Sequence, residues 1–283
     1  MVPPLRVTST MYTSFALAGL GSLGQPMLNA LLAQKVSTIV LSRTESSTKR
    51  SSIGAQCTVQ VDYSAPAALT ETLKRHRIDA VISTLAVKDG GMDAQRVLAA
   101  AAKAAGVKIF VPSEFGVTKN GRAGGVFQMK NDFIDYLREI DLPCATFYVG
   151  MFIEFLPWLL NLDEGTAYLL SDSDAEFGVT STKDIADFVT YVLTHLPPFL
   201  LENQTFTIHG DRTSLKRLPQ LLRADTIEFV HEIPGPAGDR KGALQKLISA
   251  GAASEEGSND NHLWPEHQWL SIRDVLMSNS THF

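Results

Sequence analysis

The sequence predicts an α/β fold with a doubly wound parallel sheet and a smaller C-terminal region. Short apolar runs alternate with helical patterns over the first half of the chain, which is typical of parallel βαβ units. A glycine-rich turn, GLGSLG, stands directly between the first apolar run and the first helical pattern. With 283 residues, the chain is long enough for one such domain and a second region.

The glycine-rich turn follows the first predicted strand, Phe15–Ala18. Its three glycines have the spacing of the dinucleotide-binding fingerprint: Gly19, Gly21 and Gly24. In that fingerprint one glycine makes the tight turn, one lets the backbone approach a pyrophosphate, and one packs the helix on the strand. The flanking strand and helix distinguish the pattern from an ordinary glycine-rich turn, so we expect a Rossmann-type dinucleotide site.

The helix predicted after the turn is amphipathic, with apolar residues at i, i+4, i+7 and i+8: Leu23, Met27, Ala30 and Leu31. Backbone amides at the start of a helix favour an anion, because they lack partners and lie at the positive end of the helix dipole. The pyrophosphate is therefore expected at the turn residues Gly19, Gly21, Ser22, Leu23 and Gly24.

The second predicted strand, Ser37–Leu41, ends at Ser42 and Arg43, without the acid that usually binds the ribose in NAD-preferring sites. An arginine at this position suits a 2′-phosphate. We therefore predict NADPH as the cofactor, with its 2′-phosphate on Arg43 and with help from Ser42 or Lys49. The alternative is that Arg43 is a solvated surface charge.

The other elements alternate in the same way. The predicted strands are Cys57–Val61, Ala80–Ser83, Lys108–Val111 and Pro143–Val149, and the helices between them are Ala67–His76, Met92–Ala105 and Phe127–Ile140. Ligands of such sheets bind beyond the carboxyl ends of the strands. The ends expected to face ligands are Arg43, Asp62, Thr84–Ala86 and Pro112–Gly116. Among them, Thr84 and Leu85 are expected beside the nicotinamide, and Ser113 and Phe115 near a substrate carbonyl or phenol.

These assignments divide the chain into an extension over residues 1–12, a NAD(P)-binding domain over 13–150 and a substrate-binding region over 151–283. The last region is expected to interleave with the sheet and not to fold independently. The apolar residues that begin it are expected to form a pocket wall, with plain core packing as the alternative: Met151, Phe152, Phe155 and Trp158. Tyr148, in the strand before them, is expected to contact the substrate as well.

Composition excludes several classes of function. A net charge of −5 gives no support for binding to nucleic acid or a membrane surface. The longest apolar region, Cys144–Leu160, contains Glu154 and Pro157 and does not qualify as a membrane span. The seven histidines are scattered and the two cysteines have no near partner, so no metal site is expected. Buried, reduced cysteines indicate a cytoplasmic protein.

Lys130 lies on the inward stripe of its predicted helix, at the spacing of Phe133, Leu137 and Ile140. An ammonium on such a face is partly desolvated, which lowers its pKa and brings proton transfer within reach at neutral pH. The alternative is a lysine near a helix start whose head reaches back to water. The pattern alone leaves both interpretations open.

Seven segments together resemble the NmrA-like, isoflavone reductase-like branch of the atypical short-chain dehydrogenases. They are AGLGSLG, Ser42-Arg43, VPSEFGV, FQMKNDF, YVGMF, DIADFV and LWPEHQWLSIRDVL. PSEFG followed by Lys130 is the most specific of them. The resemblance implies NADPH as hydride source, a lysine in the catalytic region, and aromatic or polyketide-like substrates of secondary metabolism.

Two departures from the family pattern stand out. The glycine turn is one residue shorter than the more common GxxGxxG form, and the chain is abbreviated between Asp211 and Glu232, which leaves the pocket shape open. In addition, no tyrosine has a lysine four residues later, so the Tyr-x-x-x-Lys proton donor of ordinary short-chain dehydrogenases is not available.

The expected function is NADPH-dependent reduction of a small aromatic or conjugated substrate, with Lys130, as proton donor or acceptor, and Ser113 as the catalytic residues. Lys130 is also expected among the cofactor-binding residues. One alternative is a dinucleotide-sensing regulator without turnover. Another is an isomerase or cyclase that uses the cofactor structurally. The expected partner is a small molecule, and a homodimer stays open.

Overall fold

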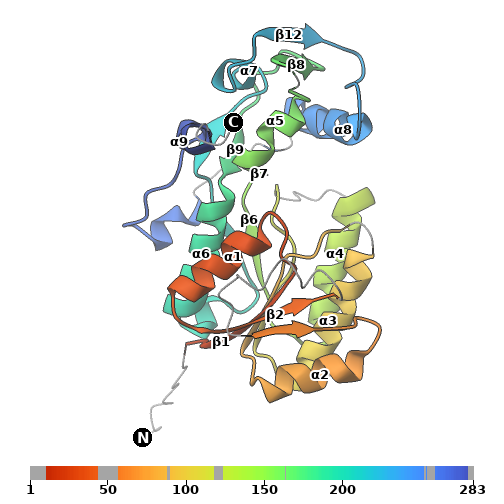
Figure 1. Cartoon of the computed structure of the whole chain (residues 1–283), viewed down its shortest axis with the longest axis vertical. Coiled ribbons are helices and arrows are strands. Elements are labelled where there is room, and N and C mark those ends of the chain that lie inside the picture. Colours follow the sequence, from red (N-terminus) through yellow and green to blue (C-terminus); the bar gives the residue numbers. More distant parts are fainter. Residues whose placement is uncertain are drawn as a thin grey trace, which may run out of the picture. The chain divides into compact units, whose positions relative to one another are not determined.

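The computed structural model describes residues 11–43, 57–87, 90–117, 124–162, 164–251, 253 and 259–279 (Figure 1). These residues form two compact units, each built from several stretches of chain. Of the described residues, unit 1 contains those within 11–114, 124–146 and 186–205, and unit 2 contains those within 115–117, 147–185 and 206–279. Lys49 lies outside the described residues.

Unit 1 is built on a parallel sheet of five strands in the order β3-β2-β1-β4-β5. The strands are β1 (Ser14–Ala18), β2 (Ser37–Ser42), β3 (Cys57–Gln60), β4 (Ala80–Ser83) and β5 (Ile109–Val111). Beyond β5, Phe110 is bridged to Cys144, just ahead of β6 (Ala145–Tyr148), which pairs with β10 (Gln204–Thr207). The strand order reverses between β1 and β4, which defines a doubly wound sheet and confirms the predicted fold class.

Helices cover both faces of the sheet, which explains why the strands β1, β4 and β5 are buried along their whole length. The helices are α1 (Gly24–Ala33), α2 (Pro66–Arg75), α3 (Gly91–Ala105), α4 (Gly125–Glu139) and α6 (Thr182–His195). Leu69 of α2, Leu98 of α3 and Phe133 of α4 pack in one cluster with Ala16 and Val81 of the sheet. On the other face α1 and α6 lie side by side (Figure 1), where the Thr190 hydroxyl donates to the Met27 sulfur at 3.8 Å.

Asp79 fastens the start of β1 to the start of β4. Its carboxylate accepts hydrogen bonds from the backbone N–H groups of Thr13 (3.0 Å) and Ser14 (3.3 Å) and lies 2.7 Å from the Lys108 ammonium. Burial by itself raises the pKa of Asp79, but the hydrogen bonds and the charge of Lys108 outweigh it and hold the pKa below its usual value.

We expect Asp79→Asn to lower the free energy of unfolding by about 1–3 kcal/mol at pH 7, the worth of hydrogen bonds to a charged group. Because the folded-state pKa is lowered, this stabilisation is complete above the unfolded-state pKa of about 3.9 and disappears as the pH falls through the folded-state value. Urea unfolding of both proteins at pH 7 and in acid checks this prediction. An equal gap between them at both pH values would contradict it.

Unit 2 contains two small sheets. In the first, β9 (Phe177–Thr180) pairs in parallel with β7 (Met151–Phe152) and antiparallel with β11 (Asp211–Thr213). In the second, β8 (Thr166–Leu169) pairs in parallel with β12 (Thr226–Phe229). The helices of the unit are η2 (Ile153–Phe155), α5 (Leu156–Leu159), α7 (Leu218–Leu221), α8 (Gly238–Ser249), η4 (Asp260–Leu263) and α9 (Ile272–Asn279), and η3 (Pro198–Leu200) belongs to unit 1.

The last described segment, residues 259–279, is held to the start of α6 by a buried carboxylate. Asp184 accepts hydrogen bonds from His267 Nε2 and from the Leu270 N–H, both at 2.9 Å. The His267 ring also stacks on Trp264, with ring centroids 4.2 Å apart. This segment is therefore part of the packing of unit 2.

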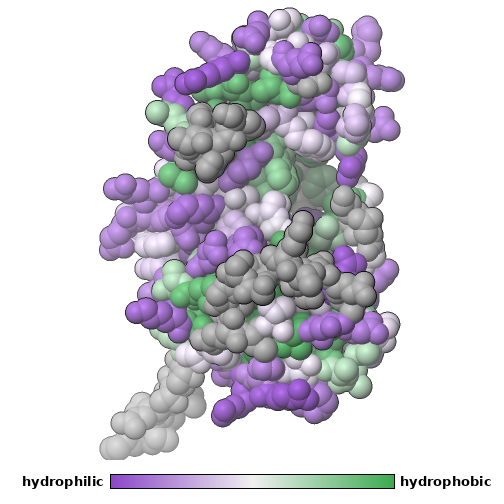
Figure 2. Space-filling view, viewed as in Figure 1, coloured by the Kyte–Doolittle hydropathy of each residue, from purple (hydrophilic) through white to green (hydrophobic). Residues whose placement is uncertain are grey.

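The face drawn in Figure 2 is covered mostly by hydrophilic residues, with smaller hydrophobic areas among them. Among the helices of the described residues, none combines the length and the apolar character needed to cross a membrane. Large apolar side chains that are exposed in unit 2 include Phe155, Trp158, Ile227 and Phe229.

Candidate functional site

Each of the three glycines in the turn after β1 has different surroundings. Gly19 has φ +94°, and a Cβ there would lie 2.9 Å from the Thr84 hydroxyl oxygen. A Cβ on Gly24 would lie 2.2 Å from the Gly19 carbonyl oxygen, so this glycine lets α1 pack closely on the turn. A Cβ on Gly21 would meet no atom within 4 Å among the described residues, so its surface faces open space.

The start of α1 has the properties of an anion site. The residue before the helix, Leu23, gives no side-chain cap, and the first turn carries no acidic residue. Backbone amides at such a helix start attract phosphate. The open space over Gly21 lies beside this helix start, so the turn fits the pyrophosphate of a dinucleotide.

A cavity of about 270 Å³, here called the turn cavity, brings most of the predicted cofactor residues together. The predicted residues that line it are Gly19, Gly21, Ser42, Arg43, Thr84 and Leu85. It is also lined by Ala86, which belongs to a strand end expected to face ligands, and by three residues not assigned to the site from the sequence: Leu20, Leu41 and Tyr63. The other predicted turn residues, Ser22, Leu23 and Gly24, do not line this cavity.

Thr84 holds the turn in shape. Its hydroxyl lies 3.1 Å from the Ala18 carbonyl oxygen and 3.0 Å from that of Gly19, and its N–H donates to Ala18 at 2.8 Å. The hydroxyl proton is thus directed at the backbone at the end of β1. Thr84 contributes to the turn cavity by fixing the path of the glycine turn.

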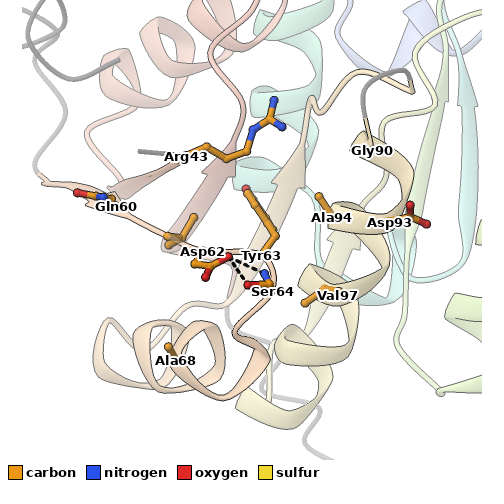
Figure 3. A pocket seen from close by; sticks show the side chains of 11 residues that line it. Arg43, Gln60, Asp62, Tyr63, Ser64, Ala68, Gly90, Asp93, Ala94 and Val97 are labelled. Atoms are coloured by element: carbon orange, nitrogen blue, oxygen red, sulfur yellow. Dashed lines mark hydrogen bonds between the residues drawn. The ribbon is translucent and has the colours of Figure 1, made fainter. Parts of the chain in front are cut away.

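A second, wider cavity of about 870 Å³ lies beyond the ends of β2 and β3, and we call it the strand-end cavity (Figure 3). Arg43 and Tyr63 line it as well as the turn cavity. Its floor includes Asp62, whose carboxylate accepts hydrogen bonds from the Ser64 hydroxyl (2.7 Å) and N–H (2.8 Å), and these bonds lower the pKa of Asp62. On its α3 side it is lined by Gly90, Asp93, Ala94 and Val97.

Lys130 of α4 forms a buried ion pair. Its ammonium lies 3.4 Å from a carboxylate oxygen of Glu114, and the two side chains are 15% and 3% exposed. The lysine head therefore faces a buried carboxylate. Glu114 belongs to the PSEFG segment, but the residues alone gave no reason to pair it with Lys130.

Ser113 lies one residue before Glu114 and is fixed through its backbone. Its N–H donates to the side-chain oxygen of Gln95, a buried residue of α3, at 2.8 Å. Ser113, Glu114 and Lys130 all belong to unit 1, together with the turn cavity. The structure thus gathers both predicted catalytic residues and most of the predicted cofactor residues in one unit.

The residues predicted as a pocket wall belong to unit 2. Phe115 stacks on Phe147 with ring centroids 6.3 Å apart, and Phe152 lies 5.3 Å from Phe155. Phe155 and Trp158 are 39% and 37% exposed, so these two are not core residues. The Lys241 ammonium lies over the ring of Trp158, 5.6 Å from the ring centroid.

A comparison with protein families identifies the class of this chain. The model of the NmrA-like family matches residues 16–230, and the chain belongs to this family. The resemblance inferred from the sequence is thereby confirmed. Oxidoreductase aprR of Aspergillus flavus is 33% identical over 175 residues, which are 57% of this chain and 57% of that protein. The match thus spans little more than half the length of that curated relative.

Solved structures share the fold over nearly the whole chain. Leucoanthocyanidin reductase of Vitis vinifera, solved with NADPH, has a TM-score of 0.80 at 19% identity, covering 94% of this chain and 98% of that one. An isoflavone reductase has a TM-score of 0.78 at 18% identity, covering 94% and 99%. AtPrR2, solved with NADP+ and (+)pinoresinol, has a TM-score of 0.75 at 20% identity, covering 94% and 98%.

Proposed function

We propose that this protein is an NADPH-dependent reductase of a small aromatic or conjugated metabolite. The observation that carries the proposal is the turn cavity, in which the open face of Gly21 and the side chain of Arg43 come together. The relative from Aspergillus flavus is named an oxidoreductase, and the Vitis vinifera reductase is solved with NADPH. Both support the same class of reaction.

The residues of unit 1 would hold the cofactor by position and charge. The glycine turn and the start of α1 would bind the pyrophosphate, and Arg43 would neutralise the 2′-phosphate. Lys49 is proposed to assist Arg43, and Leu85 to flank the nicotinamide. When bound, NADPH supplies the hydride, and the protein supplies orientation and electrostatics.

Lys130 is proposed as the residue that moves a proton. Its ammonium would donate a proton to a substrate oxygen that gains negative charge on reduction. The buried carboxylate of Glu114 lies 3.4 Å from it and would keep the ammonium charged and in place. Ser113 is proposed to contact the same substrate oxygen.

Five aromatic residues and one methionine of unit 2 are proposed to contact an aromatic substrate: Phe115, Tyr148, Met151, Phe152, Phe155 and Trp158. The exposed faces of Phe155 and Trp158 support this, because exposed large aromatic side chains are typical of binding surfaces.

The test is to add isoflavones, lignans such as pinoresinol and leucoanthocyanidins to the purified protein with NADPH. Loss of NADPH absorbance together with a reduced product supports the proposal. Conversion of substrate without loss of NADPH would instead indicate an isomerase or cyclase. Tight NADPH binding without any conversion across the panel would favour a regulatory protein.

We expect Arg43→Glu to weaken NADPH binding by about 10–100-fold and to leave NADH binding nearly unchanged, because a repelling carboxylate replaces a charge-assisted partner of the 2′-phosphate. Titration by intrinsic fluorescence gives both dissociation constants. Arg75→Glu is the matched control, since Arg75 is exposed on α2 and lines neither cavity. A wild-type protein with equal affinity for the two cofactors would contradict the assignment.

A further inference from the structure

Tyr63 lines both cavities described above, the turn cavity and the strand-end cavity. Its side chain is only 9% exposed, and within the described residues its hydroxyl oxygen is buried without a hydrogen-bond partner. Figure 3 shows the hydroxyl end of the ring directed toward the side chain of Arg43. From the sequence, only its neighbour Asp62 is predicted to face ligands after β3.

A buried hydroxyl without a partner is unfavourable by about 1–3 kcal/mol, so a native protein rarely retains one without a reason. Burial also raises the pKa of Tyr63 to about 12, an effect that the charge of Arg43 opposes. The phenol is therefore protonated at neutral pH and has a hydrogen to donate.

Arg43 cannot accept the hydrogen of this hydroxyl. A guanidinium carries only N–H donors and has no acceptor, so beside Arg43 the phenol could only accept a hydrogen bond and its own hydrogen would stay unpaired. What the pair lacks is an acceptor with negative charge, which could receive hydrogen bonds from both. The two donors line the same two cavities, so one anionic group at their junction would serve both.

We propose that Tyr63 is a second ligand of the 2′-phosphate of NADPH, donating its hydroxyl hydrogen to the phosphate that Arg43 neutralises. This inference rests on the proposed NADPH dependence of the protein. It assigns cofactor choice to two residues on neighbouring strand ends, one supplying charge and the other a directed hydrogen bond.

The test is Tyr63→Phe, which removes the hydroxyl and keeps the ring. We expect the dissociation constant for NADPH to rise about 10-fold or more, as for loss of a hydrogen bond to a charged group, while that for NADH stays unchanged. Adenosine 2′,5′-bisphosphate, which lacks the nicotinamide half, should lose affinity by the same factor. The melting temperature without ligand should stay the same or rise, because no internal hydrogen bond is lost.

Tyr12→Phe is the matched control. The Tyr12 hydroxyl is also buried without a partner among the described residues, and burial raises its pKa, but Tyr12 lines neither cavity. This variant should bind NADPH and NADH like the wild type.

Three results with Tyr63→Phe would overturn the role of Tyr63 but not the proposed NADPH dependence. They are NADPH affinity within about twofold of wild type, a parallel loss of NADH affinity, or a lower melting temperature of the ligand-free variant. The first shows that the hydroxyl makes no such bond, the second assigns it to a part shared by both cofactors, and the third reveals an internal partner. A wild-type protein that does not prefer NADPH overturns this inference and the proposed NADPH dependence together, so the two failures are told apart by the wild-type titration.

Discussion

Replacing Lys130 with methionine is expected to lower turnover by about 10²–10⁴-fold, the usual worth of a positioned acid or base. Methionine keeps much of the length of the side chain but removes the ammonium that would give the proton. NADPH affinity should stay close to that of the wild type, because the turn cavity does not include Lys130. Steady-state kinetics together with a cofactor titration measures both effects.

The ion pair with Glu114 requires a second variant in this experiment. Lys130→Met removes the cation that faces a carboxylate only 3% exposed, and breaking such a buried pair typically costs about 3–5 kcal/mol of stability. Adding Glu114→Gln removes that charge and should restore much of the melting temperature without restoring turnover. Recovery of turnover in the double variant would show that Lys130 is structural. Lys74→Met, on the exposed side of α2, is the control for loss of a lysine.

Gly21→Val is expected to weaken NADPH and NADH alike, on the order of 100-fold or more, and to leave the fold intact. The new side chain would stand in the open space over the turn, where no described atom lies within 4 Å of a Cβ, and would exclude the pyrophosphate. Circular dichroism and thermal unfolding should match the wild type, and cofactor titration should show the loss.

Gly24→Val is expected to lower the stability of the ligand-free protein, which Gly21→Val leaves unchanged. Comparing the two variants separates the effect of helix packing from that of ligand exclusion. A Cβ on Gly24 would lie 2.2 Å from the Gly19 carbonyl oxygen, so α1 has to move and the ligand-free protein should melt at a lower temperature. If Gly21→Val keeps the thermal stabilisation that NADPH gives the wild type, the glycine turn does not bind the phosphates.

The sheet of unit 1 was predicted well because its signals are local. Each strand is an apolar run closed by a glycine, proline or polar residue, and each helix repeats its apolar positions with a single period. The glycine turn and Arg43 were found for the same reason, since each is a short local signal at the end of a predicted strand. The structure then places Gly21 and Arg43 in one cavity, as that spacing predicts.

Contacts between residues far apart in the sequence could not be predicted from it. Nothing local connects Glu114 with Lys130, or shows that the Tyr63 hydroxyl is buried without a partner. The buried face of helix α8 carries polar residues such as Lys241 and Gln245 in place of an apolar stripe, so no apolar period marks its start in the sequence. The short strands β7 and β11 are recognisable only through β9, which pairs with both.

The way the chain alternates between the two units limits how the protein can be divided. Residues 124–146 and 186–205 belong to unit 1, although residues 147–185 between them belong to unit 2. A single proteolytic nick therefore cannot release either unit whole. A gene fragment stopped after β6 would encode the five-stranded sheet without α6, most of which belongs to unit 1. Exchange of unit 2 between relatives, by recombination or by design, requires matched replacement of several separate segments at once. A change of specificity is then more accessible through point substitutions than through the swap of a contiguous module.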